Sequence, residues 1–361
     1  MTRLEVRRQS AQFRRRVVRD SGDVRQQFSG NDYLSLSRHP KVIAAACAAL
    51  ERWGAGSSGS PLLSGYTQLH QQLEEALKDW LAVDGVILFN SGFAANHGVI
   101  TTLIADGTIF FDRLCHASLI DGIRATRNRF KRFSHNAVAD INAAPNDWVI
   151  TEGTFSMDGD RVPGVDLTDM VTEKQLNLLL DDAHGLGVWG EQGLGSFAQV
   201  RDCARVTIGT FGKAFGAGGA FVAGNHDDIE SLIQFCREYI YSTSLPPAQV
   251  AAAHAALQII RSSQGTELRQ QLKYNIDYFK AQFEQRGLPL INSDSPVQSW
   301  IVGDDATVMQ IAAELRQQSL FVSAVRPPTV AKGSARIRFS LQSQHTKADI
   351  DQLLASLDRL I

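Results

Sequence analysis

Short apolar segments alternate with longer segments of helical character through most of the chain beyond residue 84. A short apolar segment bounded by Gly, Asp or Asn is typical of a strand buried on both faces. Where a crossover helix separates two such strands, they are expected to be parallel neighbours in one sheet. We therefore predict an α/β fold with a large, mostly parallel sheet. Its strands are Val86–Phe89, Thr108–Asp112, Asp147–Thr151, Leu176–Asp181, Val206–Gly209 and Gly219–Val222.

Helices are predicted along the whole chain, and the arrangement of helices and strands changes towards the C-terminus. Apolar residues at helical spacing predict helices over Pro40–Gly54, Thr67–Val83, Gln249–Arg261 and Glu267–Arg286. Further on, the predicted elements are strands at Val297–Val302, Leu320–Val325 and Ala335–Leu341 and helices from Thr307 to Gln317 and from Thr346. A chain of 361 residues is long enough for about two domains. We therefore expect an N-terminal segment (1–38), a large domain (39–264) and a small α+β domain (265–361).

Composition excludes several classes of protein. The chain has 44% hydrophobic residues and a formal net charge of −2, which is ordinary for a globular protein and gives no general attraction to nucleic acid. No stretch of 18 apolar residues occurs, so no membrane span is expected. The basic N-terminus is not followed by the apolar region of a secretory signal, which favours a cytoplasmic location.

Positive charge is concentrated at the N-terminus. Residues 1–20 contain seven arginines, among them Arg14, Arg15 and Arg16, against only Glu5 and Asp20. Such a segment is typical of a solvated amphipathic helix, of a basic arm that binds a polyanion or a membrane surface, or of a transit peptide. With the function considered below, we favour a helix that lies over an anionic substrate.

Cysteine and histidine spacing argues against a metal site. The four cysteines are far apart and form no C-x-x-C pair, so we expect small core residues in a reducing compartment. They are Cys47, Cys115, Cys203 and Cys236. The nine histidines form no H-E-x-x-H motif.

Two segments match the G-x-G-x-x-G pattern of nicotinamide-dependent dehydrogenases, Gly54–Gly59 and Gly185–Gly190. That motif has to follow a strand and open a helix. The first match follows a predicted helix, and the second continues into Glu191-Gln-Gly-Leu-Gly195, which cannot open a stable helix. Both contexts disfavour dinucleotide binding.

Three other segments indicate a different cofactor. Asp181 and His184 come at the carboxyl end of a predicted strand, where α/β sheets bind ligands. Lys213 is the only charged residue in a glycine-rich stretch after another strand, a setting that favours an amine nucleophile. The strand-to-helix junction at Asn90–Asn96 offers backbone N–H groups to a phosphate. A buried carboxylate, a lysine and a phosphate site together describe a site for pyridoxal 5'-phosphate (PLP).

The order of these motifs resembles that of the α-oxoamine synthases, PLP enzymes of the aspartate-aminotransferase fold. The resemblance runs from about residue 12 to the C-terminus. Within the family, Arg326-Pro-Pro-Thr329, Asn31-Asp-Tyr33 and Ile240–Pro247 resemble the member that acts in biotin biosynthesis. The motifs that carry the family resemblance are Ser91-Gly92-Phe93, Cys115–Ser118, Thr151–Gly159, Asp181–Gly185 and Thr210–Lys213.

The resemblance implies a role for each cofactor residue. Lys213 binds the cofactor covalently and then acts as base at the substrate Cα. Asp181 pairs with the ring nitrogen, His184 bonds the phenolic oxygen, and His116 stacks on the ring and orients the reacting groups. The remaining cofactor contacts are Gly92, Phe93 and Thr210 at the phosphate, Ser156 near the ring, and Ser242 or Thr243 reaching the phosphate of a neighbouring subunit.

The resemblance also implies the substrates and their residues. Arg326 binds the amino-acid carboxylate, Thr329 lines the same pocket, Asn31 contacts substrate, and Arg14 reaches the far carboxylate of a pimeloyl chain. The implied reaction is a decarboxylative condensation of L-alanine with a pimeloyl thioester, on acyl carrier protein or coenzyme A, to give 8-amino-7-oxononanoate. The implied assembly is a homodimer with a shared active site and no nucleic-acid or membrane partner.

Other functions share part of these features. A glycine C-acetyltransferase, a serine palmitoyltransferase or an aminolevulinate synthase has the same PLP residues. The two glycine motifs alone suggest a nicotinamide-dependent dehydrogenase. A binding module without catalytic activity is disfavoured because Lys213, Asp181, His116 and His184 are all present.

Overall fold

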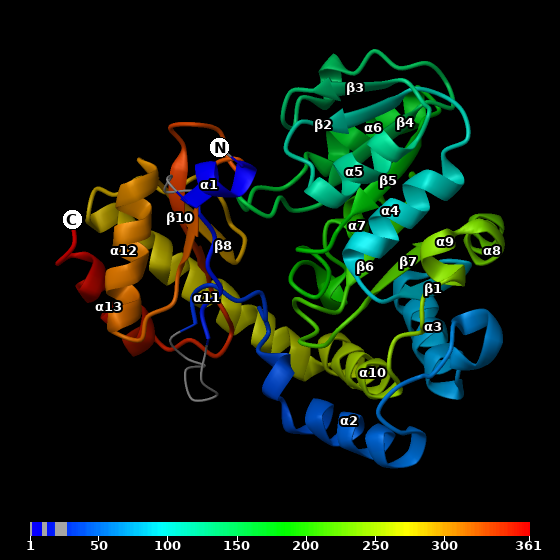
Figure 1. Cartoon of the computed structure of the whole chain (residues 1–361), viewed down its shortest axis with the longest axis horizontal. Helices are drawn as coiled ribbons and strands as arrows, with labels where there is room; N and C mark the ends of the chain where they lie inside the picture. Colours follow the sequence, from blue (N-terminus) through cyan, green and yellow to red (C-terminus); the bar gives the residue numbers. More distant parts are fainter. Residues whose placement is uncertain (1, 9–12, 19–26) are drawn as a thin grey trace. The chain divides into compact units, whose positions relative to one another are not determined.

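The computed structural model describes residues 2–8, 13–18 and 27–361 (Figure 1). The chain divides into two compact units, which we call the large unit and the small unit. The large unit consists of Leu34–Phe155 and Arg161–Arg269. The small unit consists of Met1–Tyr33, Ser156–Asp160 and Gln270–Ile361. This division differs from the sequence-based boundaries, since it places the N-terminal residues and a short internal segment with the C-terminal ones.

The large unit contains a seven-stranded sheet in the order β1-β7-β6-β5-β4-β2-β3. Only β7 runs against its neighbours, so the prediction of a mostly parallel sheet is confirmed. The strands are β1 Gly85–Phe89, β2 Ile109–Asp112, β3 Phe130–Phe133, β4 Trp148–Glu152, β5 Asn177–Asp181, β6 Ala204–Thr210 and β7 Ala220–Gly224.

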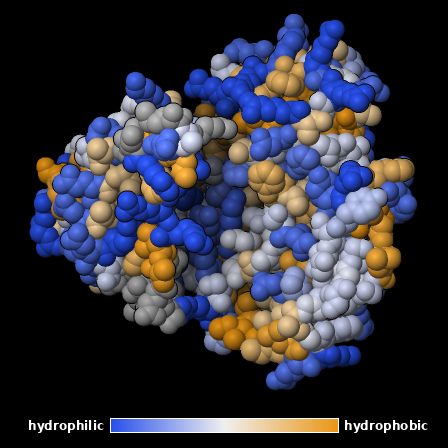
Figure 2. Space-filling model, viewed as in Figure 1, coloured by the Kyte–Doolittle hydropathy of each residue, from blue (hydrophilic) through white to orange (hydrophobic). Residues whose placement is uncertain are grey.

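Strand β3 was not predicted. Its sequence, Phe130-Lys-Arg-Phe133, is too polar to read as a buried strand, and three of its four residues are exposed. As the last strand of the sheet it has one open edge, and charged side chains there discourage pairing with another chain. Figure 2 shows hydrophilic residues gathered over this part of the large unit.

Both faces of the sheet are buried. One face packs alternate strand residues such as Phe111, Ile150 and Leu179 against helices α4, α5, α8 and α9. The residues between them, such as Phe110, Val149 and Leu178, are buried on the other face. Helix α10 packs against α2 and α3. The helices are α2 Pro40–Trp53, α3 Gln68–Leu81, α4 Gly92–Leu103, α5 Ala117–Ala125, α6 Gly164–Glu173, α7 Phe197–Val200, α8 His226–Phe235, α9 Arg237–Ile240 and α10 Pro247–Arg261.

The small unit is built on an antiparallel sheet in the order β8-β10-β9. Its strands are β8 Val297–Gly303, β9 Ser323–Val325 and β10 Ala335–Ser340, and its helices are α12 Asp305–Gln317 and α13 Lys347–Leu357. Helix α11, Ser263–Gln285, carries the chain from the large unit into the small unit. The predicted capping box at the start of α13 is present, with the Asp349 N–H donating to Thr346 Oγ1 over 3.2 Å.

The N-terminal segment belongs to the small unit because its backbone pairs there. Phe28 N–H donates to Phe321 O (2.9 Å), and Ser340 N–H donates to Phe28 O (2.7 Å). The predicted N-terminal helix is shorter than expected: α1 covers Arg3–Arg8, and residues 13–18 are irregular. Arg19 and Asp20 lie outside the described residues.

Three further expectations from the sequence can be compared with the structure. Of the four cysteines, Cys115 and Cys236 are buried as expected, whereas Cys47 is exposed on α2. No described helix combines the length and hydropathy that crossing a membrane requires. Among the described residues, no group of three or more His, Cys, Asp or Glu side chains is arranged to hold a metal ion.

Candidate active site

The candidate cofactor residues of the large unit follow the carboxyl ends of four strands. Gly92 and Phe93 follow β1, His116 follows β2, Asp181 ends β5 with His184 beyond it, and Thr210 ends β6 with Lys213 beyond it. Because these four strands run in the same direction, their carboxyl ends lie at one edge of the sheet. The topology therefore brings together residues that are far apart in the sequence, at the edge where such sheets bind ligands.

Asp181 is a buried carboxylate that is partly satisfied by donors. Its side chain is 6% exposed. Asn96 Nδ2 donates to Oδ2 over 2.7 Å, and the Ala183 N–H donates to Oδ1 over 3.0 Å. These two donors compensate part of the cost of burying the carboxylate, and a cation such as a protonated ring nitrogen would offset the remainder.

The neighbouring Asp182 has a different, structural position. It is fully buried, and its Oδ2 accepts the Phe197 N–H over 3.1 Å. A Cβ added to Gly153 or to Gly185 would lie 2.1 Å from its Oδ1, so there is no room for a ligand between these groups. Burial raises the pKa of Asp182 to about 7. Of the two adjacent acids, Asp181 is the one placed to meet a ligand.

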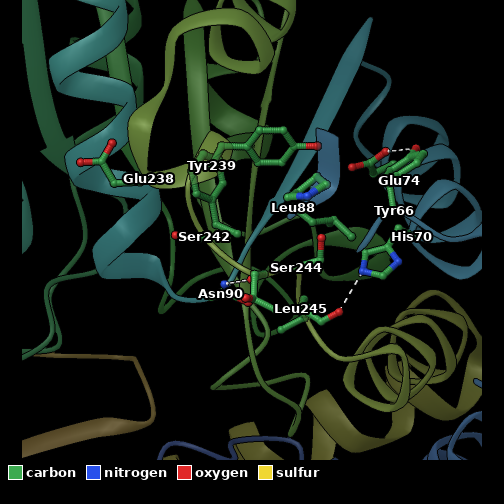
Figure 3. Close-up of a pocket in the computed structure, with 13 residues that line it drawn as sticks. Tyr66, His70, Glu74, Leu88, Asn90, Glu238, Tyr239, Ser242, Ser244 and Leu245 are labelled. Carbon is green, nitrogen blue, oxygen red and sulfur yellow. Dashed lines mark hydrogen bonds between the residues drawn. The ribbon is translucent and has the colours of Figure 1, made fainter. Parts of the chain in front are cut away.

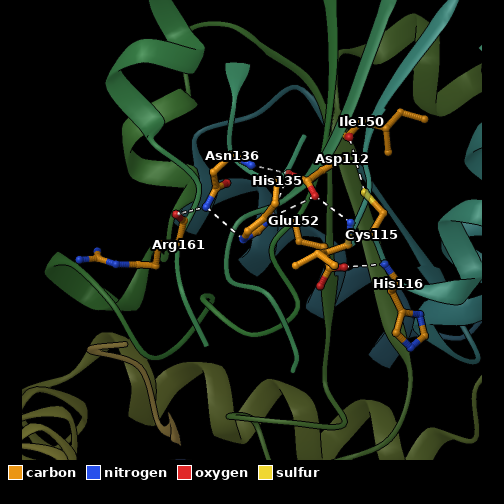
Figure 4. Close-up of polar contacts among 9 residues, drawn as sticks. Asp112, Cys115, His116, His135, Asn136, Ile150, Glu152 and Arg161 are labelled. Atoms are coloured by element: carbon orange, nitrogen blue, oxygen red, sulfur yellow. Dashed lines mark hydrogen bonds and ion pairs between the residues drawn. The ribbon is translucent and has the colours of Figure 1, made fainter. Parts of the chain in front are cut away.

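Glu152 is a second buried carboxyl group that the sequence interpretation missed. It ends β4 in register with Asp181 on β5 and is 3% exposed. Its Oε1 accepts the His116 N–H over 2.6 Å (Figure 4). Burial and the charge of Asp181 raise the pKa of Glu152 well above its usual range, although the Lys213 cation opposes this. Burial therefore favours the neutral form of Glu152.

A neutral Glu152 makes a specific prediction. Glu152→Gln keeps the size of the side chain, its neutrality and an acceptor for the His116 N–H, so cofactor affinity and kcat are expected to stay near wild type. Glu152→Leu leaves that buried N–H unpaired, which costs about 1–3 kcal/mol and lowers Tm. Thermal melts, PLP titrations and steady-state kinetics check this, and a Gln variant as impaired as the Leu variant would show that the charge of Glu152 is needed.

His116 is the N-cap of α5, and its ring is exposed at the sheet edge. Its Nδ1 lies 2.7 Å from Ser118 Oγ. Partial desolvation by the surrounding side chains lowers the pKa of His116, with Lys213 adding to the effect and Asp181 opposing it. A neutral, exposed imidazole fixed at one nitrogen is suited to lie against a planar ligand.

The expected phosphate site joins two elements of the large unit. The first N–H groups of α4, at Gly92 and Phe93, have no acceptor within the helix, because an α-helix leaves its first turn of donors unpaired. A Cβ added to Gly92 would lie 4.0 Å from Thr210 Cβ, so the helix start and the end of β6 are neighbours. Thr210 Oγ1 accepts the Gly212 N–H over 3.2 Å and donates to Gly219 O over 3.0 Å, so its hydroxyl would have to turn to donate to an anion. Helix N–H groups and a hydroxyl beside them suit an anion.

Lys213 and His184 complete the large-unit group. Lys213 lies half-buried in the turn after β6, and the buried rings of Phe211 and Phe215 anchor this turn. His184 is 5% exposed. Together with Asp181, these residues supply the amine, the carboxylate and the ring-oxygen partner that PLP requires. The N–H groups of Gly92 and Phe93 at the start of α4 fit its phosphate.

Thr243 lies beside the phosphate site of its own chain. Its carbonyl oxygen accepts from Asn90 Nδ2 over 2.5 Å, directly before α4. Thr243 lines a cavity of about 20 Å³ with Ser242, Glu238 and Tyr239 (Figure 3). Its contact with a neighbouring subunit stays a prediction.

In the small unit, three of the expected substrate residues line one cavity of about 150 Å³. Arg14, Arg326 and Thr329 face it, and none of its described lining residues is acidic. Arg14 Nη2 donates to Thr329 Oγ1 over 3.4 Å, and Arg326 Nη2 donates to Phe13 O over 2.8 Å. Burial and the charge of Arg14 lower the pKa of Arg326. Two guanidinium groups that repel each other form a site that an anion stabilises.

Asn31 and Ser156 lie around a buried arginine that the sequence interpretation did not single out. Arg338 Nε donates to Ser156 O over 2.8 Å, and Nη2 lies 3.2 Å from Asn31 Oδ1. The same Asn31 oxygen accepts from Tyr33 over 3.2 Å. In the sequence, Arg336 and Arg338 alternate with apolar residues, a pattern that predicts an exposed face, whereas Arg338 is only 5% exposed.

The dehydrogenase motifs do not form a dinucleotide site. Gly54–Gly59 follows the end of α2, and Gly185–Gly190 forms turns after β5 without opening a helix. The structure therefore agrees with the contexts expected from the sequence. A nicotinamide-dependent dehydrogenase is not supported.

Comparison with known proteins agrees with this site. Residues 26–357 match the family described as Aminotransferase class I and II. A solved serine palmitoyltransferase from S. paucimobilis with bound PLP and myriocin is 29% identical, with a TM-score of 0.87 over 92% of this chain and 86% of that one. Similarity of fold therefore does not distinguish this chain from a serine palmitoyltransferase.

The curated relative with the higher sequence identity has a different name from the serine palmitoyltransferase. An 8-amino-7-oxononanoate synthase of Citrobacter koseri is 44% identical over 338 residues, which are 92% of this chain and 88% of the relative. The solved 8-amino-7-oxononanoate synthase of Francisella tularensis is 31% identical, with a TM-score of 0.80 over 92% of this chain and 96% of that one. This chain therefore belongs to the aminotransferase class I and II family and, within it, to the 8-amino-7-oxononanoate synthases.

Proposed function

We propose that this chain joins L-alanine to a pimeloyl group, carried as a thioester on acyl carrier protein or coenzyme A, in biotin biosynthesis. The new C–C bond links the alanine Cα to the acyl carbonyl carbon, the carrier leaves as a thiol, and the alanine carboxyl group leaves as CO2. The product is 8-amino-7-oxononanoate. The observation that carries the proposal is the joint placement of Lys213, Asp181 and His116 at one sheet edge in a chain 44% identical to such a synthase.

PLP supplies an electron sink that stabilises negative charge at the substrate Cα. Asp181, held by Asn96, would keep a proton on the ring nitrogen. The Lys213 amine would hold the cofactor and act as the base that takes the proton from Cα. Gly92, Phe93 and Thr210 would hold the phosphate and His184 the ring oxygen, which would orient the substrate relative to the Lys213 amine.

The cavity of Arg14, Arg326 and Thr329 provides for substrate carboxylates. We assign Arg326 to the amino-acid carboxylate and Arg14 to the terminal carboxylate of the acyl chain. The two guanidinium groups in one cavity support carboxylate binding there, and the division between the two substrates follows from the family resemblance. Of the three consecutive arginines, Arg14 lines the cavity, whereas Arg15 lies over the Phe13 ring.

These assignments predict a split in the kinetic constants. Losing a charged hydrogen bond costs about 1.5–3 kcal/mol, so Arg14→Ala is expected to raise KM for the pimeloyl thioester about 10- to 100-fold with KM for alanine unchanged. Arg326→Ala is expected to do the reverse, and Arg15→Ala is the matched control. The assignment fails if both variants raise KM for the same substrate.

One assay tests the reaction itself. Purified holoenzyme is offered alanine, glycine or serine with acetyl, pimeloyl or palmitoyl thioesters, and the products are identified by mass. We expect one dominant product, from alanine and the pimeloyl thioester. A preference for glycine with acetyl, or for serine with palmitoyl, would reassign the substrates and leave the PLP chemistry in place.

We also propose that the enzyme works in the cytoplasm as a homodimer, with Thr243 reaching the phosphate of the other subunit. Within its own chain, Thr243 lies beside Asn90, directly before α4, so the experiment has to separate a contact within one subunit from a contact across the dimer. Light scattering of the holoenzyme measures the mass. Mixing Thr243→Ala subunits with Lys213→Ala subunits tests whether the phosphate site is shared. If it is, both defects fall in one active site of the mixed dimer and the other site is intact, so activity should be recovered.

A further inference from the structure

A continuous chain of hydrogen bonds links the Asp181 carboxylate to the His116 ring within the large unit. Asn96 Nδ2 donates to Asp181 Oδ2 (2.7 Å) and to Ser118 Oγ (2.9 Å). Ser118 Oγ in turn lies 2.7 Å from His116 Nδ1. Asn96 and Ser118 are 2% and 0% exposed, so bulk water does not replace either partner.

The direction of these bonds follows from the chemistry of the two ends. An ionised Asp181 only accepts, so Asn96 has to present its NH2 group to it. The second amide hydrogen is used on Ser118 Oγ, and the single hydroxyl hydrogen of Ser118 is then available to His116 Nδ1. The Ser118 backbone N–H points to the same nitrogen over 3.3 Å. Two donors converge on Nδ1, so that nitrogen carries a lone pair and the ring proton is on Nε2.

The other end of the Asn96 amide supports this interpretation. Its Oδ1 is buried and has no hydrogen-bond partner among the described residues. An unpaired buried acceptor destabilises a fold. Asn96 is therefore placed for what its two N–H donors do, since an apolar side chain in this position would avoid the penalty.

We propose that Asn96 and Ser118 are positioning residues that hold His116 as the neutral tautomer protonated on Nε2. This inference rests on the proposed function, in which the His116 ring lies against PLP. A neutral ring does not repel the protonated pyridine, and it keeps Nε2–H as a donor. The backbone N–H of His116, fixed by Glu152, holds the residue from the other side.

The charges around His116 come from four elements. Asp181 on β5 and Asp121 on α5 favour a protonated ring, whereas Lys213 after β6 and desolvation lower the pKa of His116. Burial raises the pKa of Glu152 on β4, which favours its neutral form. The ring also caps the N-terminus of α5, where the helix dipole disfavours a cation.

The test reads the protonation state of His116 on the protein. Holoenzyme with ¹⁵N-labelled histidine is titrated by NMR, and the signal of His116 is assigned with His116→Gln. Wild type is expected to show Nε2–H with an unprotonated Nδ1. Ser118→Ala removes one of the two donors to Nδ1, so we expect the pKa of His116 to rise by about one unit. The acid limb of the kcat profile should move with it.

Three comparisons keep the result decisive. Ser118→Thr retains the hydroxyl and should restore the wild-type pKa, and Thr101→Ala, an exposed change on α4, should leave it unchanged. Asn96→Ala should raise the pKa of His116 less than Ser118→Ala does, with no further rise in the double variant. An Nδ1–H tautomer in wild type, or an unchanged pKa in Ser118→Ala, overturns the proposal. These signals do not depend on which acyl donor is used, so the proposed function is judged separately.

Discussion

Lys213→Ala is expected to abolish the covalent adduct between the protein and PLP. Lys213 lies in the turn after β6, at the same sheet edge as Asp181, and its charge acts on both His116 and Glu152. Losing the base at Cα costs about 10²- to 10⁴-fold in rate, and losing the covalent anchor adds to this. Borohydride reduction followed by intact mass, together with kcat, measures both effects.

The control for Lys213 is Lys78→Ala, a lysine of α3 that pairs with Glu75 at the protein surface. It should keep the adduct, the visible absorption of bound PLP and full activity. Thermal melts of both apoproteins show whether either change unfolds the chain. A borohydride-stable adduct in the Lys213→Ala protein would move the lysine assignment to another residue.

Asp181→Asn has the second-largest expected effect. The substitution keeps the size of the side chain and removes the negative charge that holds a proton on the ring nitrogen. Electrostatic groups aimed at developing charge contribute about 10²- to 10³-fold in rate, so we expect kcat to fall by that factor. The phosphate contacts at Gly92, Phe93 and Thr210 are unchanged, so PLP binding should weaken far less. The absorption spectrum of bound PLP, recorded against pH, reports whether the ring nitrogen has lost its proton.

The neighbouring acid provides a matched control. Asp182→Asn retains an oxygen that accepts the Phe197 N–H and leaves the Asp181 carboxylate intact. It should change Tm, because Asp182 is fully buried between glycines, while the spectrum and kcat stay close to wild type. If the two Asn variants lost the same rate, the distinction between a cofactor partner and a structural acid would be wrong.

Most strands of the large unit could be predicted because a strand buried on both faces is a continuous apolar run in the sequence. A run such as Leu178-Leu-Leu180 is apolar at every position, since both faces of β5 are covered. Strand β3 was missed for the converse reason. Lys131 and Arg132 are exposed, so nothing local distinguishes this edge strand from a loop. It becomes a strand only by pairing with β2.

The sequence also yielded the residues with unusual chemistry in an unusual setting, such as Lys213 among glycines and Asp181 after an apolar run. It missed residues whose role depends on a neighbour from elsewhere in the chain. Glu152 matters because strand register places it beside Asp181, and Asn96 matters because α4 turns its amide towards both Asp181 and Ser118. No spacing of residues in the sequence indicates either of these contacts.

The sequence by itself determined the fold class, the cofactor and the reaction family, because each depends on residue types in a fixed order along the chain. The tertiary structure decided which of two adjacent acids is enclosed between glycines, which of three arginines lines the cavity of the small unit, and that Phe28 pairs with Phe321 and Ser340. These are questions of distance and burial between segments far apart in the chain. Packing and hydrogen-bond geometry determine these distances, and the composition of a local segment does not indicate them.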